Sequence, residues 1–277
     1  MTISCSAMRR IQWLVFAAAL LAFAWFHQGG GWNQNVRFAM VRAMVEEGQF
    51  WIDHYMIYRK STDGSGNDRL ERIPVRNAEY FLDGKKHVLS WRDTNGQMIM
   101  LNGDLEPKPG TTYVEPGDVA VSGDLSFHGN HFHPNKAPGM SFASVPAYLL
   151  IYTCERLAGI NPDDWQVLTI NAWLTSALSV GLISALGCVL FFRTALQLSE
   201  GKAVASLLAT LAFTFGTMFF PYATMLYEHN VIAVALLASF FLLYRLKPAE
   251  GSAKEHPATG RERLHLALAG FCAGYAA

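Results

Sequence analysis

Long apolar runs with very few charges are the feature that most restricts what this chain can fold into. The first run covers residues 11–27 and follows the basic pair Arg9-Arg10. Later runs cover residues 165–192, 203–220, 230–244 and 264–277. A helix needs about 20 predominantly apolar residues to cross the hydrocarbon core of a bilayer. The sequence therefore predicts an α-helical integral membrane protein with about four to five spans.

The composition supports this class and argues against others. Only 16% of the 277 residues are charged, and the formal net charge is zero. Soluble domains usually carry about a quarter charged residues. Without a basic excess, nucleic acid is not an expected partner. The four cysteines show no paired spacing, so we expect small buried hydrophobic side chains and no disulfide framework.

The basic residues predict the orientation of the spans. Arg9 and Arg10 keep the N-terminus in the cytoplasm, and the segment after the first run is exported. A cleavable signal peptide is the alternative, because Ala22-Phe23-Ala24 resembles a small-x-small cleavage site. The resulting location is a bacterial cytoplasmic (inner) membrane, with several passes.

Three parts follow from this topology. Residues 1–27 form a cytoplasmic tail and the first span, residues 28–164 a large outer loop, and residues 165–277 a bundle of further spans. The last apolar run stops after 14 residues, which is too short to cross, so we expect a fragment of a longer protein.

The outer loop contains two expected interfacial helices. The first covers residues 33–48, with Asn33 as its N-cap and Gly48 as its stop. Apolar side chains gather on one face of this helix, and Asn35, Arg42 and Glu46 lie on the other. The second covers residues 139–157. It is too short and too polar for a span, and a span there would place the basic 245–263 loop outside.

A β insert is expected between the helices, over residues 73–114. Apolar runs flank Asp83-Gly84, and another follows Asn95-Gly96. Such dipeptides between apolar runs are a strong hairpin signal. We interpret this insert as a packing or lid element without catalytic residues.

The stretch from Gly117 to Gly139 is the richest in functional residue types. A lysine, an aspartate and three histidines at the membrane edge suit the capture of an anionic headgroup such as a phosphate. His128, His131 and His133 could instead hold a divalent metal, but their spacing matches no common zinc pattern. We therefore expect hydrogen bonds from these histidines, and no cofactor.

The order of these motifs resembles the N-terminal half of GT-C glycosyltransferases. The features are a Lys-x-Pro-Gly turn into an apolar helix, an Asp-Asp-Trp opening of a span, and a Glu228-His229 patch after a later one. The similar families are the protein O-mannosyltransferases and the aminoarabinose transferases of lipid A. The resemblance implies transfer of a sugar from a polyprenyl phosphate to a lipid, glycan or protein acceptor outside the membrane.

The resemblance also implies roles for particular residues. An acid in the first outer loop acts as base, a lysine beside the Pro-rich turn contacts the donor phosphate, and a second outer loop offers another acid. Lys136 matches the lysine and Glu228 the second acid. The acid pair that the class usually carries just after its first span is missing, because residues 33–39 contain no carboxylate.

The remaining assignments follow from that departure. Since asparagine cannot serve as a general base, Asp53 and Asp118 are the candidate bases. Arg37 would support Lys136 on the phosphate. Sugar or acceptor hydroxyls would be bound by Asn33, Asn35, His131 and His133. The alternative is a non-catalytic membrane subunit that binds a lipid-linked glycan.

Overall fold

The chain forms two compact units in a computed structural model. The model describes residues 4–56, 58–62, 64, 66, 68–72, 75–76, 79–82, 85–88, 111–114, 124–129, 131–246 and 259–276. One unit, which we call the bundle unit, combines Met1–Phe26 with Val180–Ala277. The other, the mixed unit, covers His27–Ser179. Thus the first apolar helix belongs with the last third of the chain.

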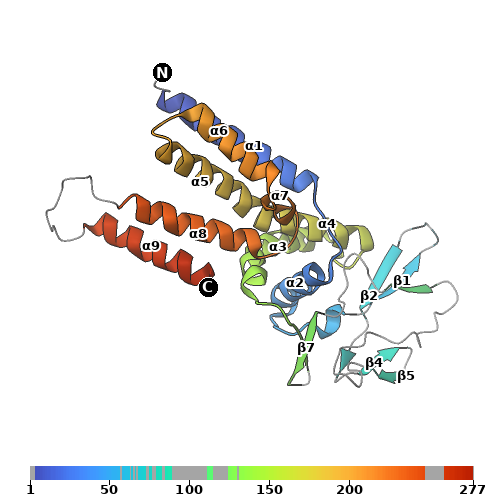
Figure 1. The fold of residues 1–277 in the computed structure, drawn as a ribbon. Coiled ribbons are helices and arrows are strands. Elements are labelled where there is room, and N and C mark those ends of the chain that lie inside the picture. The colour runs from blue at the N-terminus through green and yellow to red at the C-terminus, as the bar shows by residue number, and fades with distance from the viewer. Residues whose placement is uncertain are drawn as a thin grey trace. The chain divides into compact units, whose positions relative to one another are not determined.

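The bundle unit consists of apolar helices (Figure 1). They are α1 (Cys5–Trp25), α5 (Leu182–Leu198), α6 (Ala203–Gly216), the short α7 (Phe219–Ala223), α8 (His229–Tyr244) and α9 (Gly260–Ala276). Helices α1, α6 and α8 pack against α5, and α9 packs against α8. The buried core includes Phe23, Ala185, Cys188 and Phe219. Large apolar side chains also remain exposed on the outer faces, for example Leu14, Leu208 and Phe271.

Among the residues that the structure describes, two helical segments are long and apolar enough to cross a membrane. They are Ser6–Trp25 and the continuous segment Trp165–Leu198. The helices Ala203–Gly216 and His229–Tyr244 are apolar but shorter. Length and composition are the basis of this finding, and an N-terminal signal sequence has the same properties as the first segment. The chain is therefore mostly helical, with two candidate membrane helices.

A close contact between α5 and α8 depends on a glycine, and we expect Gly187→Ala to loosen it. A Cβ atom at position 187 would lie 2.3 Å from Val234 Cγ2. Overpacking of this kind costs about 1–3 kcal/mol. Thermal unfolding in detergent micelles should show a lower midpoint. The matched control is Gly270→Ala in α9, where a Cβ meets nothing within 4 Å. Adding Val234→Ala should restore the midpoint, and no restoration would contradict the steric explanation.

The mixed unit packs three helices against irregular and β structure (Figure 1). Its helices are α2 (Trp32–Arg42), which continues as a π-helical turn η1 (Ala43–Glu47), α3 (Gly139–Ala158) and α4 (Trp165–Ser176). A 3-10 turn, η2 (Asp53–Tyr55), follows η1. Helix α3 contacts both α2 and α4. From α4 the chain continues through a second π-helical turn, η3 (Ala177–Gly181), into α5.

The strands in the described part of the chain form three small antiparallel groups. The first has the order β2-β1-β6, from β1 (Tyr58–Thr62), β2 (Asp68–Arg72) and β6 (Thr111–Val114). The second joins β3 (Val75–Arg76), β4 (Glu79–Leu82) and β5 (Lys85–Val88). The third is a hairpin of β7 (Leu125–His128) and β8 (His131–Pro134). Gly129 in its turn has a φ of +58°, a conformation that glycine adopts without strain.

The first interfacial helix differs from the prediction in two ways. Its N-cap is Gly31 and not Asn33, whose Oδ1 instead accepts a hydrogen bond of 2.6 Å from Arg37 Nε. The predicted stop at Gly48 is confirmed, since this residue takes the left-handed conformation with a φ of +66°. The supposed polar face is not solvated: Asn35 and Arg42 are buried. Helix α2 therefore lies inside the unit, where Arg37 bonds Asn33, and Arg42 pairs with Glu46 and Asp163.

The β insert begins earlier than predicted. Strands start at Tyr58, 15 residues before the expected boundary at 73, because β1 and β2 pair with each other from Tyr58–Arg72 to Thr62–Asp68. The strands on either side of Asp83-Gly84 pair as predicted, with Leu82 opposite Lys85. The expected strand after Asn95-Gly96 lies outside the described residues.

Candidate functional site

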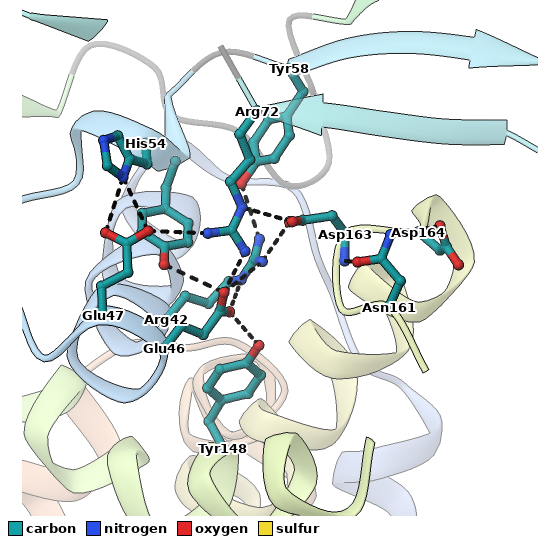
Figure 2. Close-up of polar contacts among 11 residues, drawn as sticks. Arg42, Glu46, Glu47, His54, Tyr58, Arg72, Tyr148, Asn161, Asp163 and Asp164 are labelled. Atoms are coloured by element: carbon teal, nitrogen blue, oxygen red, sulfur yellow. Dashed lines mark hydrogen bonds and ion pairs between the residues drawn. The ribbon is translucent and has the colours of Figure 1, made fainter. Parts of the chain in front are cut away.

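Four segments of the mixed unit bring two arginines and two acids together in a charge cluster: Arg42, Glu46, Arg72 and Asp163 (Figure 2). Arg42 Nε lies 2.7 Å from Glu46 Oε1, and Arg42 Nη2 lies 2.7 Å from Asp163 Oδ1. Arg72 meets the other oxygen of each acid. Its Nη2 pairs with Glu46 Oε2, and its Nε lies 2.8 Å from Asp163 Oδ2.

Three tyrosines enclose the charge cluster. Tyr148 donates a hydrogen bond of 2.6 Å to Glu46 Oε1, and Tyr58 accepts one of 3.0 Å from Arg42 Nη1. The ring of Tyr55 lies 5.0 Å from Arg42 Cζ and 4.6 Å from Arg72 Cζ, which is cation–π distance. At the outer edge, Glu47 accepts from Arg72 at 3.3 Å. The guanidiniums are thus held by acids, hydroxyls and an aromatic face.

The pKa shifts in the charge cluster follow from burial and pairing. Burial alone would raise the pKa of the Glu46 carboxyl, but the charges of Arg42 and Arg72 outweigh it and hold that pKa below its usual value. The same balance lowers the pKa of Asp163. Burial would lower the pKa of Arg42, yet its tyrosine and carboxylate neighbours raise it well above the ordinary value. All four groups therefore stay charged at neutral pH.

This arrangement gives the charge cluster a structural role: it acts as a brace, by which we mean that it links four segments of the mixed unit. Its two positive and two negative charges cancel, and the Arg42 side chain is only 2% exposed. Mutually paired, buried charges have no need of an external ligand, whereas removing one partner is costly. The cluster ties α2, η1, β2 and the turn before α4 to one another. It holds the framework on which more open side chains are placed.

The more open side chains include a carboxylate–imidazole pair, Asp53 and His131. The η2 turn begins at Asp53, and β8 begins at His131. His131 Nδ1 lies 2.7 Å from Asp53 Oδ2, and the backbone N–H of Phe132 donates a bond of 2.8 Å to Asp53 Oδ1. Ile52 N–H also donates to the Phe132 carbonyl at 2.9 Å. Two segments 78 residues apart are thus joined by backbone and side-chain bonds.

The two members of the pair differ in exposure. The Asp53 side chain is 8% exposed, while that of His131 is 40% exposed. Trp51 stacks on the imidazole, with ring centroids 4.3 Å apart and planes 18° apart. A carboxylate partner makes Nδ1 the donor, so in the neutral imidazole Nε2 is the nitrogen with the lone pair. The pair can accept a proton at Nε2 or bind a hydroxyl group there.

The turn into α3 is anchored by Arg37. This buried side chain donates a bond of 3.1 Å from Nη1 to the Ala137 carbonyl, and Ser141 Oγ donates one of 3.2 Å to the Arg37 carbonyl. Lys136 lies beside this turn, with its Nζ 3.1 Å from Asp124 Oδ1 and its side chain 31% exposed. Arg37 therefore positions the turn, and Lys136 is the more accessible cation of the two.

The other predicted site residues are dispersed. His133 belongs to the same strand as His131, β8, and its Nδ1 lies 3.2 Å from the Phe50 carbonyl. Asn35 is buried in α2. Glu228 belongs to the bundle unit, directly before α8. Asp118 lies outside the described residues. The roles proposed for these residues stay predictions.

Some important residues were not singled out from the sequence. Arg72 and Tyr148 carried no motif, and Trp51 was not expected beside His131. The spacing of Arg42 and Glu46, four residues apart on one helix, was a usable signal for an ion pair. Within the part of the chain that the structure describes, no three His, Cys, Asp or Glu side chains form a group that could hold a metal ion.

Comparison with known proteins adds no family to this description. The geometry above, with the charge cluster as a brace and Asp53–His131 as the open polar pair, is what the functional argument rests on. No protein-family model, curated protein or solved structure matches the chain.

Proposed function

We propose that this chain is part of an integral membrane glycosyltransferase of the GT-C type. It moves a sugar from a polyprenyl phosphate to an acceptor on the outer face of a bacterial cytoplasmic membrane. The two long apolar helices and the two shorter ones support a multi-pass arrangement. The exposed apolar side chains on the bundle unit support it as well, because lipid would cover them.

The distribution of basic residues supports an outer location for the mixed unit. Basic residues near the ends of spans favour the cytoplasmic side. Arg9 and Arg10 lie in the first turns of α1, and Arg193 and Lys202 flank the α5–α6 connection. These four basic residues then lie on the cytoplasmic side, and residues 28–164, between the first two spans, lie outside. A donor carried in the bilayer would reach the polar side chains of these residues from the membrane.

The observation that carries the proposed activity is the Asp53–His131 pair. Glycosyl transfer to a hydroxyl needs a group that removes a proton from the acceptor, and a carboxylate–histidine pair is suited to that task. The pair lies in the same unit as the Arg37-anchored turn that presents Lys136. A cation near the departing phosphate would stabilise its negative charge.

Transfer of radiolabelled sugar tests this proposal directly. Membranes from cells that express the gene would be incubated with a panel of polyprenyl-phosphate sugars, beside membranes from cells that do not. We expect label to move from at least one donor to a membrane or protein acceptor only when the protein is present. No transfer from any donor, with the protein folded and inserted, would overturn the proposal.

The second candidate is a non-catalytic membrane subunit that binds a lipid-linked glycan. One observation favours it: residues 33–39 lack the acid pair of the GT-C class, and Asn33 is engaged by Arg37 at 2.6 Å. This subunit would bind the donor without transferring sugar. Binding of a polyprenyl-phosphate sugar together with no transfer would therefore select it.

We expect Lys136→Ala to weaken binding of the lipid donor. The cation is the more accessible one at the turn, and a charge-assisted bond to phosphate contributes about 1.5–3 kcal/mol, or roughly 10- to 100-fold in affinity. The partner Asp124 loses little, since partly exposed ion pairs contribute weakly. Titration with a fluorescent polyprenyl phosphate measures the change. Lys202→Ala, with an exposed side chain at the start of α6, is the control. Equal effects of both variants would remove Lys136 from the phosphate site.

A further inference from the structure

We propose that His131, through Nε2, is the catalytic base of the transfer, and that Asp53 is a positioning residue rather than the base. This inference rests on the proposed glycosyltransferase function and names the proton acceptor within it. The sequence had pointed to Asp53 or Asp118 as base and to His131 as a binding residue. The geometry instead makes His131 the base and Asp53 the residue that positions it.

Both carboxylate oxygens of Asp53 have partners within the protein. Its Oδ2 faces His131 Nδ1 at 2.7 Å, and its Oδ1 accepts the backbone N–H of Phe132 at 2.8 Å. With only 8% of the side chain exposed, the Asp53 carboxylate offers little surface to an acceptor hydroxyl. A general base has to reach the proton that it removes within hydrogen-bond distance. Asp53 therefore acts through its neighbour.

His131 is placed to meet that requirement. Its side chain is 40% exposed, and the nitrogen opposite Asp53 carries the lone pair. The ring is fixed on three sides: Asp53 holds Nδ1, Trp51 stacks on its face, and the paired strand β7 holds the backbone. A base held in one orientation needs little rearrangement before the reaction.

The proposed step balances in bonds and protons. His131 Nε2 takes the proton of the acceptor hydroxyl as the hydroxyl oxygen bonds to the anomeric carbon of the sugar. The bond from that carbon to the phosphate oxygen breaks, and its electron pair leaves with the polyprenyl phosphate. The imidazolium that forms is stabilised by the Asp53 carboxylate and then passes its proton to solvent or to the released phosphate.

The test is sugar transfer by His131→Ala in membranes, with and without added imidazole. General base catalysis contributes about 10²- to 10⁴-fold, so we expect a loss of at least 100-fold. Free imidazole should restore part of the rate by occupying the space of the missing ring. His54→Ala is the matched control, because this exposed histidine of the η2 turn bonds Glu47 and has no role in the proposed site. It should stay within about twofold of wild type, as exposed side chains outside a site usually do.

Asp53→Asn separates positioning from folding. The amide keeps the size of the side chain but can donate to Nδ1, so the ring can turn or change tautomer. We expect kcat to fall at least 100-fold, as for other orienting groups, while KM for the lipid donor stays within about threefold. A general loss of structure would raise KM and lower the amount of inserted protein together.

The outcomes distinguish the two levels of the proposal. If wild-type protein is inserted and transfers no sugar, the proposed function is overturned and the base with it. If wild-type transfers sugar and His131→Ala does so equally well, only the base assignment is overturned. A loss in His131→Ala that imidazole does not restore means a structural role, which also overturns it. Loss with restoration, together with unchanged transfer by His54→Ala, establishes His131 as the base.

Discussion

Replacing Arg42 by alanine lowers the free energy of unfolding more than any other single change that we expect in the mixed unit. The guanidinium bonds Glu46, Asp163 and Tyr58 at once. Its loss leaves the buried Glu46 and the partly buried Asp163 to a single arginine, and an uncompensated buried charge costs about 3–5 kcal/mol. For a chain of this size, the thermal midpoint should fall by roughly 10 °C.

Thermal unfolding in detergent micelles measures this effect, with Arg156→Ala as its control. Arg156 is exposed near the end of α3 and carries the same charge, so its removal should change the midpoint little. If Arg42→Ala and Arg156→Ala unfold at the same temperature, the charge cluster does not brace the mixed unit.

Acidification should remove the stability that the charge cluster contributes. The pKa of both Glu46 and Asp163 is lower in the folded protein than the usual value, after burial is outweighed by Arg42 and Arg72. A lowered pKa means that stability is fully present above the ordinary carboxyl pKa, at about pH 4, and is lost as pH falls through the folded value. The thermal midpoint should therefore be flat near neutrality and drop steeply below about pH 4.

The double variant Glu46→Gln with Asp163→Asn isolates this contribution. It lacks both titrating groups, so it should be less stable than wild type at pH 7 and should lose less stability on acidification. The two curves should converge at low pH, because protonated carboxyls no longer pair with the arginines. Parallel curves over the whole range would mean that other carboxyls govern the acid response.

The sequence was a good guide to structure wherever one short stretch decides the outcome. Apolar runs located the helices of the bundle unit, and Asp83-Gly84 located a hairpin. Gly48 ended its helix as predicted, because this kind of helix end depends only on the left-handed backbone conformation of one glycine. The prediction of Asn33 as the N-cap was wrong, because the Asn33 side chain accepts a hydrogen bond from Arg37 and does not cap the helix.

Features that join distant stretches could not be predicted in this way. The sequence singled out Asp53 and His131 separately, but not as a pair, because 78 residues separate them and only the folded chain joins β8 to η2. The polar face of residues 33–48 looked solvated for the same reason. Arg72 and Asp163, which bury Arg42 and Glu46, come from segments 26 and 117 residues beyond Glu46.

The bonds between Ile52, Asp53 and Phe132 have an evolutionary consequence. They join the two ends of the chain segment between Asp53 and His131. Arg72, in the first part of this segment, pairs with Glu46 of the charge cluster. The distance between Asp53 and His131 is therefore set by the joined ends and not by the number of residues between them. Insertions and deletions between β2 and β7 should accordingly leave the Asp53–His131 pair in place.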